Sequence, residues 1–348
     1  MNSVARLSAP ERAFLFQETA QRRGLAPLII EKDFWVCWTL KHLFDAPLSQ
    51  HLIFKGGTSL SKIFHVIERF SEDIDLSISR ESLGFGADQE PEAASSKKQT
   101  QHRIEQLQQA CEQKIAYELL PSLQVAFATI LGDVSDGEAS QSFWQLEQDS
   151  NDPQTLLFTY PRRQDTNLLP TSYLKPVVRI ELGARSDHWP AGVYPLTPYA
   201  AEEFPDYFEA PTCRVKTLEA ERTFWEKATI LHAEYFRPDT SITADRISRH
   251  YYDLYQMVGS PIAKQALTRL DLLKRVAEHK RVFFRSAWAR YEEACPGSLR
   301  LLPPKEKQSA LRIDYDKMKE MFFAQRPSFQ QLLDVLQELE KRINEQNY

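Results

Sequence analysis

Hydrophobic and polar positions recur with two different periods along the chain, and the change between them predicts the order of elements. Apolar residues at helical spacing predict helices over residues 10–24, 30–44 and 101–126. Short apolar or alternating runs predict strands over residues 51–54, 73–78, 143–146, 155–160 and 176–182. The first half of the chain therefore predicts a mixture of strands and helices.

The pattern changes near residue 217. After it, apolar spacing predicts helices over 218–236, 244–258 and 263–290, with two closing helices within 306–345. Before it, residues 194–208 are Pro-rich and predicted to be irregular, residues 81–98 form a polar loop, and residues 133–153 are polar and acidic. We therefore predict a mixed domain over 1–216, with N-terminal helices, and a helical domain over 217–348.

Composition narrows the class of protein. The chain has 348 residues, is 42% hydrophobic and carries a formal net charge of -5, so any nucleic-acid partner needs a local basic patch. The four cysteines are too scattered for a zinc or redox motif; they are Cys37, Cys111, Cys213 and Cys295. We see no signal peptide and no apolar run approaching the roughly 20 residues of a membrane helix, which predicts a cytoplasmic protein without membrane contact.

A glycine turn follows the first predicted strand. Such a turn between a strand and a helix lets backbone N–H groups approach a phosphate, and nearby hydroxyls and lysines add donors. Lys55 and Lys62 supply charge, although Lys62 has the alternative of being solvated. The predicted nucleotide-binding residues are Gly56, Gly57, Thr58 and Ser59.

Two acids follow on the second strand. Asp73 and Asp75 are two apart, so both side chains project from one face, where like charges repel unless a cation joins them. Mg²⁺ or Mn²⁺ binds carboxylates and nucleotide phosphates together. Alone, a Gly-Gly pair is usually a turn and a D-x-D pair a solvated strand edge. In this order, they predict metal-dependent attack on the α-phosphate of a nucleotide.

The Gly-Gly-Thr-Ser to Asp-x-Asp pattern resembles the nucleotidyltransferase superfamily, and more narrowly the AbiEii/AbiGii toxin family of type IV toxin–antitoxin systems. Residues 30–36, 222–229 and 249–254 resemble further stretches of that family. The resemblance covers roughly residues 25–260. It implies an α+β protein with the minimal nucleotidyltransferase fold, a mixed sheet flanked by helices, followed by a helical C-terminal part.

The resemblance also assigns roles. Asp73 and Asp75 would be catalytic metal ligands, Lys227 would contact the nucleotide phosphates, and Asp253 would be a second essential acid. Residue spacing leaves alternatives open. Lys227 also has Glu226 or Glu221 as possible ion-pair partners on a helix surface, and Asp253 has Arg249 one turn earlier.

A third carboxylate is expected on a later strand. Superfamily members commonly use one, and Glu181 is the candidate here, with a simple pair to Arg179 as the alternative. Spacing does not decide whether Glu181 or Asp253 acts as the base. Arg69 and Ser71 are candidates for shaping the turn or touching phosphate, and Arg69 has surface pairing with Glu68 or Glu72 as its alternative.

Basic and aromatic residues along the predicted helix 263–290 are candidates for RNA contact. The basic members are Lys274, Arg275, Lys280, Arg281, Arg285 and Arg290, and the aromatic ones are Phe283, Phe284 and Trp288. The alternative is a solvated face for the basic residues and a core position for the aromatic ones. Arg246 and Arg249 are further candidates for the same contact.

The expected function is that of a toxin that transfers a nucleoside monophosphate from an NTP to an RNA acceptor, which the resemblance points to as tRNA. The resemblance also implies a cognate antitoxin protein as a partner. Three alternatives remain: transfer to a protein or small molecule, transfer of the γ-phosphoryl group, and a non-catalytic nucleotide-binding module. The oligomeric state does not follow from the sequence.

Overall fold

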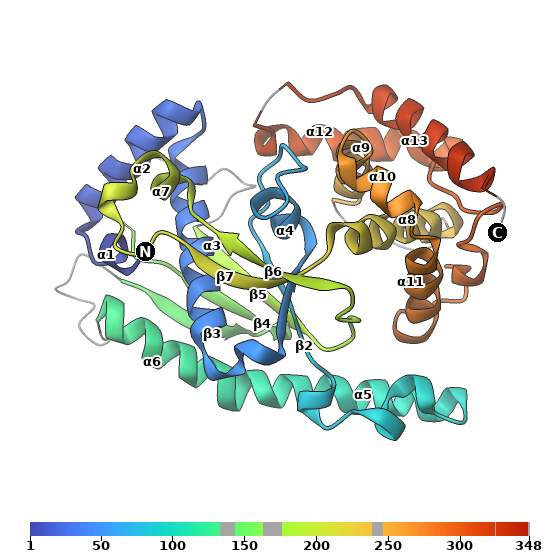
Figure 1. The fold of residues 1–348 in the computed structure, drawn as a ribbon, viewed down its shortest axis with the longest axis horizontal. Helices are drawn as coiled ribbons and strands as arrows, with labels where there is room; N and C mark the ends of the chain where they lie inside the picture. The colour runs from blue at the N-terminus through green and yellow to red at the C-terminus, as the bar shows by residue number, and fades with distance from the viewer. Residues whose placement is uncertain (133–142, 163–175, 239–245, 324, 347–348) are drawn as a thin grey trace. The chain divides into compact units, whose positions relative to one another are not determined.

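The computed structural model describes residues 1–132, 143–162, 176–238, 246–323 and 325–346. The chain divides into two compact units (Figure 1). Unit 1 comprises residues 1–63, 71–93 and 101–217, and unit 2 comprises residues 64–70, 94–100 and 218–348.

A seven-stranded mixed sheet organises unit 1. Its order is β3-β4-β5-β2-β1-β7-β6, in which β2 pairs in parallel with β5 and β1 with β7. The β1–β2, β3–β4 and β4–β5 pairs are antiparallel. The strands are β1 Leu52–Lys55, β2 Ile74–Ile78, β3 Gln145–Asp149, β4 Asp152–Thr159, β5 Val177–Gly183, β6 Ala191–Leu196 and β7 Cys213–Leu218. The expected α+β class is confirmed.

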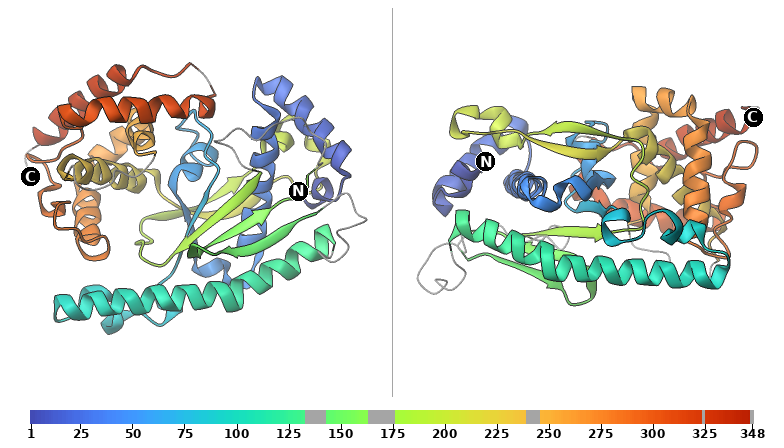
Figure 2. Two further views of the ribbon diagram at one scale, coloured as in Figure 1. Left: turned by 180° about the vertical axis from the view of Figure 1, so that it is seen from behind. Right: turned by 60° about the horizontal axis from the view of Figure 1, so that its bottom comes forward.

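Helices flank this sheet. They are α1 Asn2–Ala5, α2 Ala9–Arg23, α3 Pro27–Asp45, α4 Gly56–Lys62, α6 Leu120–Leu131 and α7 Tyr199–Glu203. The helix α5, Lys97–Lys114, starts in unit 2 and reaches α6 through a π-helical turn, which confirms the long helix expected over 101–126. Figure 2 shows α6 running beside β3, where Gln124 Nε2 donates to the carbonyl oxygen of Leu146 at 3.0 Å.

Aromatic packing joins α3 to the sheet. Trp35 and Trp38 of α3 contact Phe158 of β4 at ring-centroid distances of 5.8 and 5.7 Å, and Phe127 of α6 lies 4.8 Å from Phe158. All four side chains are fully buried. Along β5, buried positions alternate with half-buried ones, so the other sheet face retains polar side chains such as Arg179 and Glu181.

Unit 2 is helical. Its helices are α8 Ala220–Phe236, α9 Ser248–Val258, α10 Pro261–Leu267, α11 Leu270–Phe283, α12 Gln308–Lys317 and α13 Phe329–Asn344. The helix α8 packs against α9, α10 and α11. Trp225 of α8 is fully buried, and its Nε1 donates to the carbonyl oxygen of Ala266 at 3.2 Å.

The single helix expected over 263–290 is wrong. The chain leaves α10 at Thr268, whose Oγ1 donates to the carbonyl oxygen of Gln265, and Arg269 has a non-helical backbone. At this helix end the carbonyl oxygen of Ala266 accepts from the backbone N–H of Arg269 at 2.8 Å, and it also accepts from Trp225 Nε1 of α8. Because a contact from another helix stabilises this break, no Gly or Pro marks it in the sequence.

The irregular stretch expected over 194–208 is also partly wrong, since it contains the end of β6 and all of α7. Because β6 is an edge strand, it tolerates Pro195, whose missing N–H would disrupt an inner strand. The strand β7 was not predicted from the sequence.

Some expectations lie outside the described residues, namely residues 133–142 of the acidic stretch 133–153 and the first two residues of the helix expected over 244–258. Within the described ranges, no helix is both long enough and apolar enough to cross a membrane.

Candidate functional site

The turn between β1 and α4 depends on glycine at position 56. Gly56 has φ of +82°, in the left-handed region that side chains disfavour. A Cβ added there would lie 1.9 Å from Oδ2 of Asp75. The Asp75 carboxylate therefore packs directly against the Gly56 backbone, so the glycine turn and the acidic strand form one arrangement.

We expect Gly56→Ala to abolish the function of this site as well as lower stability. The new methyl group must displace the Asp75 carboxylate, and the left-handed backbone adds a cost of about 1–2 kcal/mol. Gly24→Ala is the matched control, because Gly24 also has a positive φ, +65°, but nothing lies within 4 Å of its added Cβ. Denaturant unfolding and activity of both variants check this; equal losses of activity would contradict it.

Several contacts position the turn and the segment before the acids. Thr58 Oγ1 donates to the carbonyl oxygen of Asp73 at 2.5 Å and lies 3.0 Å from Ser71 Oγ. Lys32 of α3 forms a buried ion pair with Glu72. Ser59 Oγ donates to the carbonyl oxygen of Gly56 at 2.8 Å. Thr58 and Ser59 thus support the turn, and their direct contact with phosphate stays a prediction.

Lys62 is buried rather than solvated. Its Nζ lies 2.7 Å from Oδ1 of Asp33 in α3 and 3.5 Å from the ring centroid of Tyr199. Asp33 Oδ2 accepts from the backbone N–H of Tyr199 at 2.7 Å. Because this cluster ties α4 to α3 and α7, Lys62 anchors α4 and does not face solvent.

Three carboxylates share one face of the sheet. Asp73 directly precedes β2, Asp75 lies two residues later, and Glu181 on β5 is the register partner of Asp75. Burial alone would lower the pKa of Arg179, but Asp149, Glu181 and Asp73 together raise it. The sheet therefore brings Glu181 to the acidic pair from more than one hundred residues away in sequence.

The pair expected as an alternative for Glu181 is also present. Arg179 Nε lies 3.7 Å from Glu181 Oε1, while Arg179 Nη1 donates to Asp149 Oδ2 at 3.1 Å. The Glu181 side chain is 45% exposed, so contact with Arg179 leaves it accessible to a substrate.

The donor set on this face fits a hard divalent cation. Carboxylate oxygens are the ligands that Mg²⁺ takes, and the Asp75 carboxylate is held in place by close contact with Gly56. Among the described residues, no group of three or more His, Cys, Asp or Glu side chains is arranged to hold a metal alone. An ion at Asp73 and Asp75 would therefore complete its coordination with water and phosphate oxygens.

Unit 2 contains a second charged cluster. Arg69 Nε and Nη2 donate to the two oxygens of Asp253 at 2.7 and 2.8 Å, and Lys227 Nζ donates to Asp253 Oδ2 at 2.7 Å. Arg69 is 3% exposed, Asp253 is 0% exposed and Lys227 is 6% exposed. The Arg69–Asp253–Lys227 cluster thus buries two cations with one anion.

The ion pairs in this cluster differ from those that residue spacing in the sequence allowed. Lys227 pairs with Asp253, while Glu226 pairs with Arg222. Arg69 lies in the interior, which excludes the surface pairing considered for it. Burial alone would raise the pKa of Asp253, but the neighbouring cations Arg69 and Lys227 have the larger effect, so this pKa is lowered. The pKa of Lys227 is also lowered, because burial disfavours its charged form more than Asp253 favours it.

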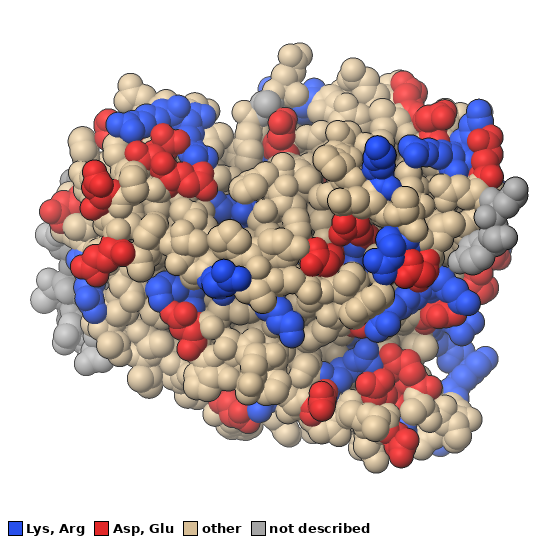
Figure 3. All heavy atoms as spheres, viewed as in Figure 1, with Lys and Arg blue, Asp and Glu red and all other residues tan. Residues whose placement is uncertain are grey.

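The basic residues expected on one helix lie partly on α11 and partly on the segment after it. Arg285 and Arg290 lie beyond the end of α11, and Lys280 is buried with its Nζ donating to the carbonyl oxygen of Glu226 at 2.8 Å. Phe283 is buried, as a core position requires, while Phe284 is 39% exposed. Figure 3 shows acidic and basic side chains interspersed over the visible face, without one broad basic field. RNA contact by this helix stays a prediction.

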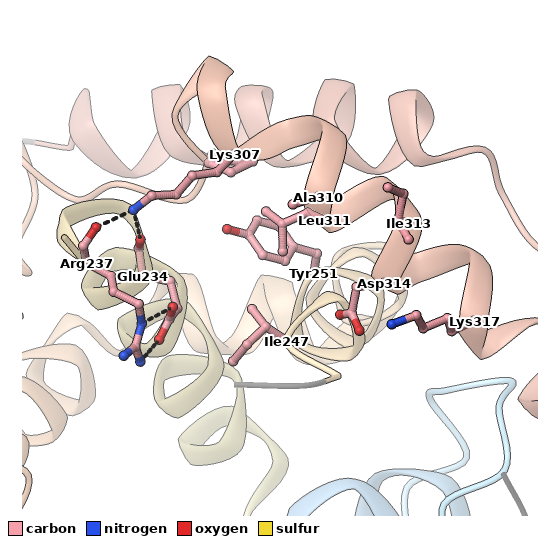
Figure 4. Close-up of a pocket in the computed structure, with 11 residues that line it drawn as sticks. Glu234, Arg237, Ile247, Tyr251, Lys307, Ala310, Leu311, Ile313, Asp314 and Lys317 are labelled. Atoms are coloured by element: carbon pink, nitrogen blue, oxygen red, sulfur yellow. Dashed lines mark hydrogen bonds and ion pairs between the residues drawn. The ribbon is translucent and has the colours of Figure 1, made fainter. Parts of the chain in front are cut away.

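A cavity of about 190 Å³ in unit 2 has a mainly structural lining (Figure 4). Lys307 Nζ donates to carbonyl oxygens at the end of α8, and Arg237 pairs with Glu234. Asp314 accepts from the backbone N–H and the hydroxyl of Ser248 at the start of α9. These charged groups support helix ends, so we assign no reaction to this cavity.

His188 is a titratable side chain that lies beside the acidic face of the sheet. Its Nε2 lies 3.0 Å from Oγ of Ser77, which lies two residues beyond Asp75 on β2. Burial, and then Lys216 and Arg80, lower its pKa from 6.5 to about 4, whereas Asp187 opposes the shift.

We therefore expect His188 to stabilise the fold only while it is neutral. Because its folded pKa is depressed, this contribution is fully present above pH 6.5 and is lost as the pH falls through about 4. Its size is on the order of 2 kcal/mol. The free energy of unfolding of His188→Gln should fall less than that of the wild type over this range; parallel curves would contradict the assignment.

Several site residues were missed in the sequence, although signals for some exist. Lys32 and Asp33 are charged positions inside an otherwise apolar helical run, which indicates buried partners. The alternation in residues 213–218 indicates a strand with outward basic residues, Arg214 and Lys216. The pairing of Arg69 with Asp253 has no local signal, since 184 residues separate them.

A carboxylate pair on a mixed sheet beside a glycine turn defines a candidate nucleotidyltransferase. The family model described as "Nucleotidyl transferase AbiEii toxin, Type IV TA system" matches residues 38–335. The chain belongs to this family of nucleotidyltransferase toxins, which confirms the family and the enzyme class expected from its motifs.

Solved structures add only distant comparisons. The nucleotidyltransferase toxin MenT4 from Mycobacterium tuberculosis is 16% identical, with a TM-score of 0.40 over 94% of this chain and 96% of that one. JHP933 from Helicobacter pylori is 13% identical, with a TM-score of 0.36 over 88% of each chain. No curated protein matches the chain.

Proposed function

We propose that this nucleotidyltransferase is a metal-dependent toxin that transfers a nucleoside monophosphate from an NTP to an RNA acceptor, with tRNA as the expected class. The single observation that carries the proposal is the close packing of Asp75 against Gly56, beside Asp73 and Glu181. It combines a carboxylate set suited to Mg²⁺ or Mn²⁺ with a turn suited to phosphates. Family membership supports a cognate antitoxin as partner and the cytoplasm as the place of action.

Asp73 and Asp75 would hold the metal, which supplies Lewis-acid stabilisation of the phosphate charge when bound. The backbone of Gly56 and Gly57 would approach the nucleotide phosphates, with Thr58 and Ser59 fixing the turn. Glu181, half-exposed beside Asp75, is our choice for the group that accepts the proton of the attacking hydroxyl.

Lys227 would contact the phosphates and stabilise charge on the departing pyrophosphate. One of its three N–H donors goes to Asp253, and no other partner is found for it among the described residues. Asp253 is a poor base, because both its oxygens accept from cations and its pKa is lowered. We therefore assign Asp253, with Arg69, to positioning Lys227.

Label transfer tests the proposed function. The protein is incubated with Mg²⁺, total RNA and each NTP in turn, radiolabelled at the α-phosphate. RNA labelled by the wild type, and not by an Asp73→Asn/Asp75→Asn variant, is the expected result. Label found only on protein or on a small molecule would contradict an RNA acceptor.

A further inference from the structure

The outward face of β7 is basic. Cys213, Val215 and Thr217 point inward and are buried, whereas Arg214 is exposed and Lys216 half-buried. In the parallel pairing of β1 with β7, Phe54 is the partner of Thr217. Because neighbours in a strand face opposite sides, Lys216 shares a sheet face with Lys55.

This is also the face of the carboxylates. Lys55 is the antiparallel register partner of Asp75, and partners opposite each other project from the same side. Lys55, Lys216 and Arg214 therefore form a row, here called the cationic strip. Lys55 is level with Leu218 at the end of β7, because Phe54 is level with Thr217. Arg214 lies four residues before Leu218, a distance of about 13 Å along the strand.

The cationic strip carries charge that the described part of the chain does not neutralise. None of its three side chains has a hydrogen bond or ion pair with a described residue. Even Lys55, directly opposite Asp75, forms no ion pair with it, since the Asp75 carboxylate turns to Gly56. Lys55 and Lys216 are both half-buried, so the strip holds partly desolvated positive charge beside the candidate metal ligands.

The pKa of His188, which lies next to the cationic strip, is affected by the same positive charges. His188 lies against Ser77, on the face and strand that carry Asp75. Besides burial, Lys216, Arg80 and Lys55 lower its pKa, and Asp187 opposes them. Positive potential therefore extends along the sheet face beyond the carboxylates.

We propose that the cationic strip binds the phosphate backbone of the acceptor, and hence that the acceptor is a polynucleotide. This inference rests on the proposed function, because it assigns the strip to the second substrate of that reaction. The strip leads about 13 Å away from the level of Asp75. A series of phosphates matches this length better than one triphosphate whose α-phosphate lies at the carboxylates. RNA supplies such a series and releases counterions on binding.

The test is RNA binding without NTP, measured by fluorescence anisotropy on end-labelled unfractionated transfer RNA over a series of salt concentrations. Arg214→Gln/Lys216→Gln is expected to weaken binding about tenfold and to make the slope of log affinity against log salt shallower by about 1.4–1.8. Binding of Mg²⁺-NTP should be unchanged. Arg6→Gln, which removes an exposed arginine outside the strip, should match the wild type.

A conservative variant separates charge from folding. Arg214→Lys/Lys216→Arg should keep the wild-type slope, and thermal unfolding should show all variants folded. An unchanged slope in the double glutamine variant would overturn the proposal, and so would weakened binding of Mg²⁺-NTP alone. Displacement of RNA by polyglutamate at equal charge concentration would overturn it in favour of an acidic protein partner. RNA binding through the strip without any label transfer would instead show the proposed function to have failed.

Discussion

Asp75→Asn is expected to lower nucleotidyl transfer by at least about 1,000-fold, a loss of about 4 kcal/mol of transition-state stabilisation. Asparagine keeps the size of the side chain and fits the space beside Gly56, but it removes the charge that would hold the metal. Stability should be unchanged or slightly higher, because the variant relieves repulsion between two carboxylates on one face. Asp73→Asn should behave in the same way.

Steady-state transfer and thermal unfolding of the same preparations check this result. Asp206→Asn is the matched control, because it removes an exposed aspartate of unit 1 outside the acidic face, and it should retain full activity. A stable Asp75→Asn protein with more than one tenth of wild-type activity would show that this carboxylate does not hold the metal.

Asp253→Ala is expected to destabilise the protein by about 3–5 kcal/mol, because it removes the buried anion that Arg69 and Lys227 share. Lys227→Met should be far milder for stability, since Asp253 keeps both hydrogen bonds to Arg69. Its activity should nevertheless fall about 100- to 1,000-fold, the usual cost of losing a donor that stabilises transition-state charge.

Urea unfolding and transfer kinetics separate these two effects. Asp253→Asn should retain more structure than Asp253→Ala, and in the folded fraction its defect should resemble that of Lys227→Met. Lys264→Met, which removes an exposed lysine of α10, is the control and should alter neither quantity. If Asp253→Ala is as stable as the wild type, or Lys227→Met as active, the roles assigned to this cluster are wrong.

The elements that carry the acids were predictable because their signals are local. Residues 73–78 alternate with period two, Gly56 and Gly57 interrupt an apolar run, and residues 218–236 keep helical spacing. The structure has β2, the turn before α4, and α8 at these places. The candidate site residues were named mostly from motifs, each contained within one short segment, and their roles stay predictions.

Contacts between distant segments had no such signal. Lys62 was open to interpretation as solvated, because its partner Asp33 is in another helix. Spacing offered Arg249 as the partner of Asp253, whereas tertiary packing brings Arg69 from 184 residues away. The end of α10 at Thr268 is contacted by Trp225 from α8 and contains no Gly or Pro, so the spacing within that segment alone predicts a longer helix.

The most direct test of nucleotidyl transfer is to follow both ends of the NTP. Wild-type protein is incubated with Mg²⁺, total RNA and an NTP radiolabelled at either the α- or the γ-phosphate. Nucleotidyl transfer predicts α-label in RNA and γ-label in pyrophosphate, in equal amounts, with neither product formed by Asp75→Asn. Appearance of γ-label on the acceptor, with release of a nucleoside diphosphate, would contradict it.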